Sequence, residues 1–414
     1  MNFFSTEVCV IGAGPGGAAA ALQLDKLGIS CLVADRARFP RDKVCGDALS
    51  GKVVVTLNRI DPGILEHFEP TGQALPSFGV QFVAPNGKSL RVPFKKNYSK
   101  SDKAPGYISR RMSFDDHLVQ QLRKRQGIRL LEETAITGFR YEDGYWLLTD
   151  DKQELTIKTR LVLAADGAQS AFARQSGLVP VEPGHYCAGI RGYYSGVQGL
   201  DPDGFIELHF LKEFLPGYFW IFPLPNGLAN VGVGMRSDAV SKKKVHLKKA
   251  MEQLLLTHPA LRDRFRHARL EGDIKGYGLP LGSKKRSLSG NGFMLVGDAG
   301  SLIDPFTGEG IGNAVISGVK AAETAAAALR AGNFSHDFLR QYDESVYKRL
   351  WNELSLSYRM QQLVKYPWLF NMVVNKSQKS KTLQDLIMSM FEDLELRNLL
   401  RSPSFYFRLL FTNR

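Results

Sequence analysis

The sequence predicts an α/β protein: a Rossmann-like nucleotide-binding domain, an inserted and mostly antiparallel β-sheet domain, and a C-terminal helical segment. Three observations carry this prediction. A glycine-rich turn follows a short apolar run near the N-terminus, two later apolar runs each lead to an aspartate, and the residues between those two runs alternate in polarity. We therefore assign residues 1–75, 105–180 and 281–335 to the discontinuous nucleotide-binding domain, 76–104 and 181–280 to the substrate-binding domain, and 336–414 to the helical region.

The composition is that of a globular protein without a disulfide framework. The chain has 414 residues, 44% of them hydrophobic, and this length fits two or three domains. Its four cysteines form no Cys-x-x-Cys pair and no His-Glu-x-x-His stretch is present, so we expect no metal site. No apolar run is long enough to span a bilayer, and the N-terminus lacks the basic start of a signal peptide. We expect a cytoplasmic protein with reduced thiols.

The N-terminal turn has the spacing of a dinucleotide-binding fingerprint. Apolar runs at 8–11 and 31–34 predict two buried parallel strands, and the stretch 18–27 predicts a helix between them. The turn carries three glycines at Gly-x-Gly-x-x-Gly spacing: Gly12, Gly14 and Gly17. The first allows the tight turn, the second lets a diphosphate approach the backbone, and the third lets helix and strand pack closely. Asp35, which ends the second run, is the candidate acceptor for a ribose hydroxyl.

Two later apolar runs predict further parallel strands of the same sheet. Residues 160–166 lead into Asp-Gly, residues 293–298 end in Gly-Asp, and a helix is predicted from about 310 to 330. Because open α/β sheets bind ligands at the carboxyl ends of their strands, Asp166 and Asp298 are candidate binding residues.

The region between these strands has a different pattern. Residues 205–210 and 231–235 alternate in polarity, which predicts antiparallel strands with one wet face. Near the C-terminus, apolar residues at helical spacing predict an amphipathic helix: Leu383, Leu386, Ile387, Met390, Phe391 and Leu394.

These features, with four further segments, resemble the geranylgeranyl reductase family of FAD-dependent oxidoreductases, in the p-hydroxybenzoate hydroxylase fold group. The segments match the family's KxCG loop, RxxFD segment, YxWxFP signature and PxxGEGI turn, at residues 40–47, 111–115, 216–223 and 305–311. The resemblance spans residues 1 to about 330. Two departures are visible: Ala173 stands where the family's DGxxSxxR pattern has arginine, and Asp47 follows Cys45-Gly46 where the reductases often have a second glycine.

The resemblance implies which residues bind FAD. The glycine turn and Asp35 would hold the ADP half, Arg111 would lie near the diphosphate, and Asp298 would bind the ribityl chain. Backbone amides at Gly308 and Gly310 would face the pyrimidine edge of the flavin, where a helix N-terminus stabilises negative charge. The remaining implied cofactor contacts are Arg36, Arg41, Cys45, Gly46, Ile136, Asp166, Gly297 and Ile311.

Cys45 is the candidate catalytic residue. Arg41 and Lys43 flank it, and their charges favour its thiolate, which suits an acid, a base or a nucleophile. In the family this cysteine lies beside the flavin, although a single cysteine is more often a small buried hydrophobe.

An aromatic stripe is the candidate substrate site. Tyr218, Trp220 and Phe222 alternate, so on a strand their side chains share one face. They form either an aromatic wall that lines a channel for an apolar substrate or a plain core stripe.

The positive charge is concentrated in one segment. Lysines and arginines exceed acids by 13 over the whole chain, and residues 241–290 hold thirteen basic residues against four acids. A solvated helix face is one interpretation, and reversible contact with an anionic membrane is the other. Nucleic acid is not expected, because no stacking or groove-reading motif accompanies the charge. Further membrane anchors would come from the aromatic residues of the tail: Trp368, Phe370, Phe405, Tyr406, Phe407 and Phe411.

The preferred function is therefore an FAD-dependent reductase. The resemblance implies that FAD, reduced by NAD(P)H or by a protein donor, passes hydride to a double bond of an isoprenoid or another apolar substrate. The first alternative is a flavin monooxygenase or halogenase for an aromatic or carrier-bound substrate. The halogenase is disfavoured because its WxWxIP signature has tryptophan where this chain has Tyr218. The second alternative is a flavoprotein that binds without turnover.

Overall fold

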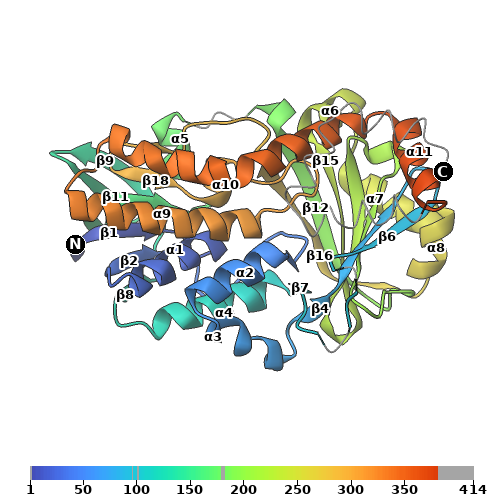
Figure 1. Ribbon diagram of the computed structural model, residues 1–414, viewed down its shortest axis with the longest axis horizontal. Coiled ribbons are helices and arrows are strands. Elements are labelled where there is room, and N and C mark those ends of the chain that lie inside the picture. Colours follow the sequence, from blue (N-terminus) through green and yellow to red (C-terminus); the bar gives the residue numbers. More distant parts are fainter. Residues whose placement is uncertain (1, 96, 100–101, 179–181, 381–414) are drawn as a thin grey trace.

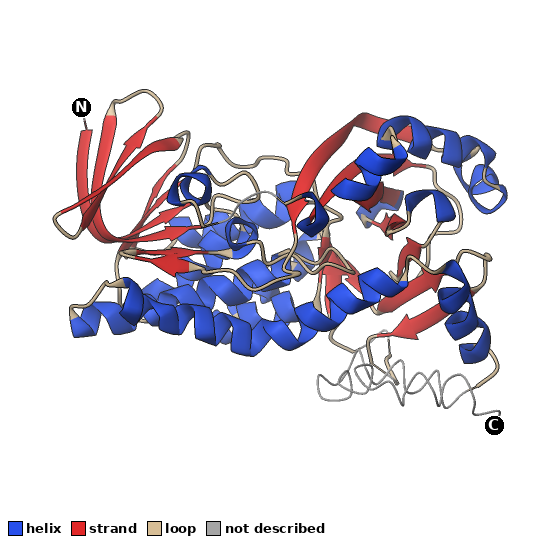
Figure 2. Cartoon of the chain, turned by 90° about the horizontal axis from the view of Figure 1, so that it is seen from above, coloured by secondary structure: helices blue, strands red, loops and turns tan. Residues whose placement is uncertain are grey.

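Two sheets lie end to end along the long axis of the molecule, and helices pack against both (Figure 1). The computed structural model describes residues 2–95, 97–99, 102–178 and 182–380. Seen from above, the helices of the N-terminal half form a layer under the first sheet, and the second sheet curves away beside it (Figure 2).

The first sheet is the predicted nucleotide-binding sheet. Its strand order is β17-β18-β11-β1-β2-β8, and β10 and β9 extend it from one half of β11. The pairs β18–β11, β11–β1, β1–β2 and β2–β8 are parallel, as the apolar runs predict, whereas β9, β10 and β17 pair antiparallel. The strands are β1 (Asn2–Ile11), β2 (Cys31–Ala34), β8 (Ile128–Leu131), β9 (Ile136–Glu142), β10 (Tyr145–Asp150), β11 (Leu155–Ala164), β17 (Ser289–Gly290) and β18 (Phe293–Leu295).

The helices that cover this sheet are α1 (Pro15–Lys26), α2 (Gly51–Ile60), α3 (Gly63–Glu66), α4 (Arg111–Arg123), α5 (Ala171–Ser176), α9 (Ile311–Ala331) and α10 (His336–Leu363). Proline at the first position starts α1, and glycines in the left-handed region follow the ends of α1 and α9, at Gly28 and Gly332. The alanines of α1 are buried, and the small residues let α1 pack closely on α9: an added Cβ on Gly318 would lie 2.2 Å from the Gly16 carbonyl oxygen.

The second sheet has the order β16-β12-β15-β14-β13-β5-β6, and its pairs are antiparallel except for the parallel pair β13–β5. Its strands are β5 (Gly79–Val83), β6 (Ser89–Pro93), β12 (Tyr186–Ser195), β13 (Ile206–His209), β14 (Gly217–Pro223), β15 (Leu228–Arg236) and β16 (Arg269–Pro280). The helices of this half are α6 (Ser237–Lys243), α7 (Leu247–Thr257), α8 (Pro259–Phe265) and α11 (Pro367–Ser377). A small third sheet, β3 (Ala48–Leu49), β7 (Gly106–Ile108) and β4 (Leu75–Ser77), lies between the two halves.

The expected wet face is wrong for the two segments that predicted it, which lie on β13 and β15. Glu207, Leu208 and His209 of β13 are all buried, and so are most residues of β15. On one face α7 and α8 cover the strands, with Met251 and Leu261 packed among the strand residues. On the other face apolar side chains, including Phe210 and Val374, form a second core cluster. Alternation in the sequence shows only that successive residues face opposite ways. At β13 and β15 both faces are covered, whereas the edge strands β6 and β16 keep exposed residues.

The structure also bears on membrane-spanning helices, metal sites and the C-terminal segment. No helix in the part of the chain that the structure describes is long and apolar enough to cross a membrane. The same described ranges contain no group of three His, Cys, Asp or Glu side chains placed to hold a metal ion. The predicted amphipathic helix from Leu383 to Leu394 and the aromatic residues from Phe405 to Phe411 lie outside the described residues.

Candidate functional site

A cavity of about 1640 Å³ brings together most of the predicted site residues. It reaches from the glycine turn after β1 to the aromatic stripe on β14. Its walls include all but two of the predicted residues: Gly12, Gly14, Asp35, Arg36, Arg41, Cys45, Gly46, Arg111, Ile136, Asp166, Tyr218, Trp220, Phe222, Asp298, Gly308, Gly310 and Ile311. The two others serve packing. A Cβ on Gly17 would lie 1.8 Å from the Gly12 carbonyl oxygen, and one on Gly297 would lie 2.7 Å from the Ala314 Cβ.

The glycine turn has the predicted backbone. Gly12 has a φ of +99°, and a Cβ there would lie 2.5 Å from the Ala165 carbonyl oxygen, so the turn tolerates only glycine. Asp35 is buried and accepts hydrogen bonds from the backbone N–H groups of Ala13 at 2.7 Å and Ala37 at 2.8 Å. Its carboxylate therefore holds the turn in shape, and it has further lone pairs for the predicted ribose contact.

Two guanidinium groups lie above this turn. A Cβ on Gly14 would be 3.6 Å from Nη2 of Arg41 and 4.0 Å from Nη2 of Arg111. Asp115, fully buried, orients both arginines: it accepts two 2.7 Å hydrogen bonds from Arg111 and one of 2.6 Å from Arg41. Burial alone would raise the pKa of Asp115, but the Arg111 and Arg41 charges outweigh it and hold that pKa below its usual value. Two positively charged guanidinium groups thus lie next to the backbone of Gly14, which carries no side chain of its own.

The turn before α9 is built around a residue that sequence reasoning missed. Asp304 is buried and accepts hydrogen bonds from Phe306 N–H at 2.9 Å, Thr307 N–H at 2.8 Å and Thr307 Oγ1 at 3.0 Å. This arrangement shapes the chain that leads through Gly308, with a φ of +72°, to the N-terminus of α9. An Asp-Pro pair before a glycine-rich turn is a turn-initiation signal, and it pointed to this role.

Two acids at the carboxyl ends of strands border the cavity, as predicted. Asp166 is mostly buried, and its Oδ1 has no hydrogen-bond partner among the residues described. Asp298 lies 3.7 Å from Nζ of Lys43, and Lys43 also lies 4.3 Å from the centre of the Tyr277 ring. A buried acceptor without a donor in a cavity wall is a position that a bound hydroxyl or amide would satisfy.

The aromatic stripe faces the cavity. Ring centres are 6.0 Å apart for Tyr218 and Trp220 and 6.2 Å apart for Trp220 and Phe222, so the three rings follow one another along β14. The Tyr218 hydroxyl donates a hydrogen bond to the Thr307 carbonyl oxygen, which joins the stripe to the turn before α9. At the other end a Cβ on Gly46 would lie 2.9 Å from the Phe222 ring, so the Cys45 loop packs directly on the stripe.

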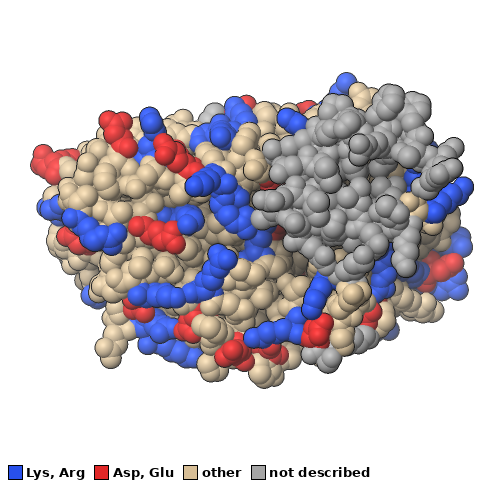
Figure 3. All heavy atoms as spheres, viewed as in Figure 1, with Lys and Arg blue, Asp and Glu red and all other residues tan. Residues whose placement is uncertain are grey.

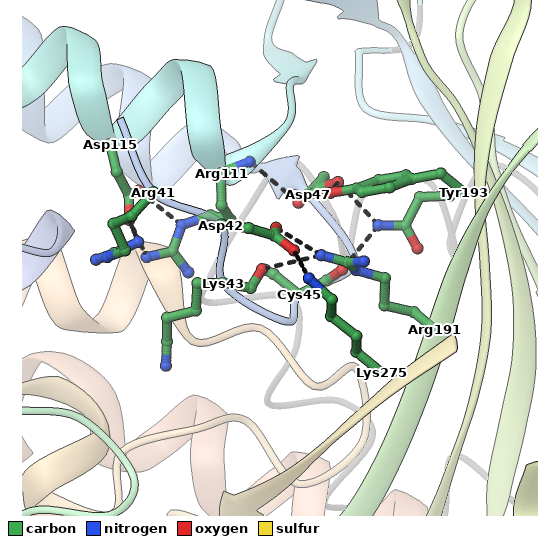
Figure 4. A network of polar contacts seen from close by, with 11 residues as sticks. Arg41, Asp42, Lys43, Cys45, Asp47, Arg111, Asp115, Arg191, Tyr193 and Lys275 are labelled. Carbon is green, nitrogen blue, oxygen red and sulfur yellow. Dashed lines mark hydrogen bonds and ion pairs between the residues drawn. The ribbon is translucent and has the colours of Figure 1, made fainter. Parts of the chain in front are cut away.

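The predicted electrostatics of Cys45 are wrong. Arg41 is bound to Asp115, and Lys43 lies against Tyr277 and beside Asp298, so neither flanking cation serves the sulfur (Figure 4). Burial raises the pKa of the Cys45 thiol, the Arg111 charge opposes this rise, and the Asp47 charge adds to it. The free site therefore holds a protonated thiol rather than a thiolate. Neighbours in sequence misled here because the side chains of a loop point in different directions.

The cavity fits FAD. The two arginines, the Gly14 backbone and the N-terminus of α1 form a site for a diphosphate, because helix N-termini and guanidinium groups both bind phosphate oxygens. The unpaired Asp166 oxygen and the Asp298 carboxylate offer acceptors for hydroxyl groups. At the far end, Gly308 and Gly310 place the 21-residue helix α9 with its N-terminus at the cavity. Positive charge, acceptors and a helix N-terminus follow in the order that diphosphate, sugar chain and flavin require.

Comparisons with known proteins agree with this site. A family model described as an FAD binding domain matches residues 5–195. The chain is 30% identical over 371 residues to a digeranylgeranylglycerophospholipid reductase from Methanococcus vannielii, covering 87% of each chain. It is 29% identical over 374 residues to a menaquinone reductase from Mycobacterium tuberculosis, covering 88% of this chain and 85% of that one.

The fold also has a close counterpart among solved structures. A geranylgeranyl bacteriochlorophyll reductase-like protein from Thermoplasma acidophilum superposes with a TM-score of 0.78, at 22% identity and with 99% of both chains covered. FAD is thus the cofactor that the motifs, the cavity and the matched domain have in common. On the glycine turn, the arginine pair and the similarity over nearly the whole chain, the protein belongs to the geranylgeranyl reductase family of FAD-dependent oxidoreductases.

Proposed function

We propose that the protein reduces carbon–carbon double bonds in the isoprenoid chain of a lipid or a quinone. The observation that carries this proposal is the continuity of one cavity from the diphosphate site to the aromatic stripe on β14. The names of the two relatives support it, because one describes a reductase of a geranylgeranyl lipid and the other a reductase of menaquinone.

The far part of the cavity suits an apolar chain. Beyond the aromatic stripe its walls carry further apolar side chains from both halves of the molecule: Val80, Phe82, Leu208, Phe210, Phe306 and Val364. Several of them stack, such as Phe210 and Phe306, whose ring centres lie 5.6 Å apart. Such walls exclude water and bind alkyl chains through buried apolar area, about 25 cal/mol per Å².

The chain's own residues supply the proton that the reaction needs. When bound, FAD supplies the hydride. Reduction of a double bond adds that hydride to one carbon and a proton to the other. Cys45 lines the cavity next to the aromatic stripe and holds a proton on its sulfur, because burial raises the pKa of its thiol. After the proton leaves, the Arg111 charge stabilises the thiolate.

An anaerobic experiment tests this function. Purified holoprotein is reduced with NADPH or NADH, our proposed reductants, and in parallel with dithionite. Geranylgeranyl lipids, menaquinone and aromatic acids are then added, and reoxidation is followed at the flavin absorption band. We expect prenyl substrates to reoxidise the flavin and to yield a product heavier by two mass units per saturated bond.

Other outcomes would contradict the proposal. Reoxidation that requires oxygen and an aromatic acid would identify a monooxygenase or a halogenase instead. Flavin that every reductant reduces but no acceptor reoxidises would identify a binding flavoprotein. Failure of NADPH and NADH alone, with normal turnover after dithionite, would overturn only the proposed reductant.

We further propose that the protein binds anionic membranes reversibly at the junction of α6, α10 and α11. Tyr366, between α10 and α11, and Trp368, in the first turn of α11, have 56% and 63% of their surface exposed. Val364, two residues before Tyr366, lines the cavity. The exposed Lys242 and Lys244 lie on and next to α6, and a 3.5 Å contact between Arg236 and Gln362 joins α6 to the end of α10.

The positive charge of residues 241–290 is less concentrated in the folded protein than the sequence indicated. Within the basic segment Arg264 forms an ion pair with the buried Glu207, and Lys275, Lys284 and Arg266 also have acidic partners. On the face shown in Figure 3, basic and acidic side chains are interspersed over the N-terminal half. The membrane proposal therefore rests on the few exposed lysines beside Tyr366 and Trp368, rather than on the total charge.

Flotation with vesicles tests the membrane proposal. We expect wild-type protein to float with vesicles that contain anionic lipid and to be released by 0.5 M salt, since screening weakens the attraction on the order of 1 kcal/mol per lysine. The variant K242E/K244E should bind more weakly than K152E/K348E, a control with the same change of net charge at exposed lysines elsewhere. Equal binding of both variants, or binding that ignores lipid charge, would contradict the proposal.

A further inference from the structure

The loop that carries Cys45 is fastened to the second sheet by buried polar contacts (Figure 4). Asp42 accepts hydrogen bonds from Arg191 at 2.7 Å and from Lys275 at 3.0 Å, which lie on β12 and β16. Arg191 has only 1% of its surface exposed. These contacts hold the Cys45 loop against the second sheet, which carries the aromatic stripe, although in sequence the loop follows the glycine turn of the first sheet.

Asp47 is the centre of these contacts. Its side chain is fully buried, and its backbone φ of 68° lies in the left-handed region that glycine prefers. Its carboxylate accepts hydrogen bonds from the Tyr193 hydroxyl at 2.8 Å, from Nδ2 of Asn230 at 2.9 Å and from the backbone N–H of Arg111 at 3.3 Å. A buried acid in a backbone conformation that costs free energy is retained for what its carboxylate does.

Asn230 connects Asp47 to the Cys45 loop and to the aromatic stripe. Its Nδ2 also donates to the Cys45 carbonyl oxygen at 2.7 Å, and its Oδ1 accepts a hydrogen bond from Nε1 of Trp220 at 2.9 Å. The amide thus uses both donor hydrogens and its oxygen at once. The backbone of the catalytic candidate and the central ring of the aromatic stripe are held by one side chain, which Asp47 orients.

The charge of Asp47 also acts on the Cys45 sulfur. Burial is the largest influence on the pKa of the thiol and raises it, the Arg111 charge lowers it, and the Asp47 charge raises it further. Burial raises the pKa of Asp47 itself to about 6, against the opposing effects of Asn230, Tyr193, Arg191 and Arg111. At neutral pH the carboxylate is mostly ionised. Three elements contribute the charged and titratable groups around the Asp47 carboxylate. Its own loop contributes Asp42 and Cys45, the start of α4 contributes Arg110 and Arg111, and β12 contributes Arg191 and Tyr193.

We propose that Asp47 is a positioning residue of the reductive site: it aligns Cys45 with Trp220 through Asn230, and its negative charge, together with burial, opposes the Arg111 guanidinium at the Cys45 sulfur. Without that charge only burial would oppose Arg111, so the thiol would give up its proton at a lower pH. The inference deepens the proposed function and rests on it only for the use of the proton. The state of the sulfur can be measured without substrate or reductant, so failure of one proposal is distinguishable from failure of the other.

The experiment is a titration of Cys45 by alkylation. Holoprotein is treated with iodoacetamide between pH 6 and pH 10, and the modified Cys45 peptide is quantified by mass spectrometry. For the charge-free variants D47N and D47G we expect a lower pH midpoint and a rate about tenfold higher at pH 8, the order of one charge–charge interaction in a partly buried site. Glycine suits the left-handed backbone at this position, so D47G tests the idea even where D47N folds poorly.

Control variants separate charge from structure. Y193F removes one hydrogen bond but leaves the charge, and it should keep the wild-type midpoint, as should the charge-retaining D47E. N230A should raise the alkylation rate at every pH without moving the midpoint, because it frees the loop only. Midpoints of D47N and D47G that match the wild type would overturn the proposal, even where their rates rise uniformly, since that pattern reports loosened packing alone.

Discussion

Asp115 is the residue on which two cavity arginines depend. Its buried carboxylate neutralises Arg111 and Arg41 at the proposed diphosphate site. Removing one partner of a buried ion pair leaves an uncompensated charge, which typically costs 3–5 kcal/mol. Asp115 therefore both positions the two arginines of the site and contributes to the stability of the fold.

We predict that D115A lowers the free energy of unfolding by about 3–5 kcal/mol, measured by urea denaturation at pH 7. The control D151A removes an exposed carboxylate and should change it by less than about 0.5 kcal/mol. Because the pKa of Asp115 is lowered in the folded protein, the stabilisation is present at neutral pH and is lost as the pH falls below about 4. Equal stabilities of D115A and D151A would contradict the role of Asp115.

Asp47 has the opposite pH signature, because its pKa is raised. Between the ordinary value of 3.8 and about 6 the folded protein binds a proton that the unfolded chain has released, so wild-type stability falls as the pH rises through this window. We predict that the stability of D47N relative to wild type improves by up to about 3 kcal/mol from pH 4 to pH 7. Urea denaturation at the two pH values checks this, and a constant difference would show that the pKa of Asp47 is ordinary.

Gly46 has no room for a side chain. A methyl group would lie 2.9 Å from the Phe222 ring, which is itself buried, so the Cys45 loop must shift. Overpacking of this kind costs about 1–3 kcal/mol, and we predict that G46A lowers kcat/KM about tenfold or more. Gly184, where an added Cβ meets nothing within 4 Å, provides the control: G184A should keep wild-type turnover.

At the scale of elements, the turn from Asp304 to Gly310 determines where α9 begins. Asp304 satisfies two backbone N–H groups and a hydroxyl in this turn, and each buried donor left unpaired costs about 1–3 kcal/mol. We predict that D304A weakens FAD binding at least about tenfold, measured by the recovery of flavin fluorescence on dissociation. The exposed Asp337, in the first turn of α10, supplies the control D337A. Unchanged affinity in D304A would show that the turn keeps its shape without the carboxylate.

Elements differ in how far the sequence predicts them. The glycine turn, Asp35, and strands β2 and β11 follow from local spacing, because buried parallel strands and tight turns restrict residue type over a few neighbouring positions. The parallel pairing of β13 with β5 was not predictable, since it joins segments more than 120 residues apart through backbone groups that every residue has. The contacts of Asp47 with Tyr193 and Asn230 were likewise not predictable, because these partners lie far from Asp47 in the sequence.

For the whole molecule, cofactor and fold stabilise each other. The cavity wall includes residues from both halves, so the complete site for FAD exists only in the folded state. At free FAD one hundred times its dissociation constant the stabilisation is about 2.7 kcal/mol. For 414 residues this predicts a rise in Tm of about 3 °C over the flavin-free protein, measured by scanning calorimetry. A Tm independent of FAD concentration would contradict preferential binding of the cofactor to the folded state.

The order of strands in the first sheet has a consequence for synthesis. β1 emerges from the ribosome before its neighbours: its partner β11 ends at residue 164, β18 follows at residues 293–295, and α9, which packs on α1, ends at residue 331. At about 5–20 residues per second, the N-terminal strand waits roughly 15–65 s for its last neighbours. Nascent chains that end before α9 therefore have no complete flavin site, and cofactor loading follows the synthesis of α9.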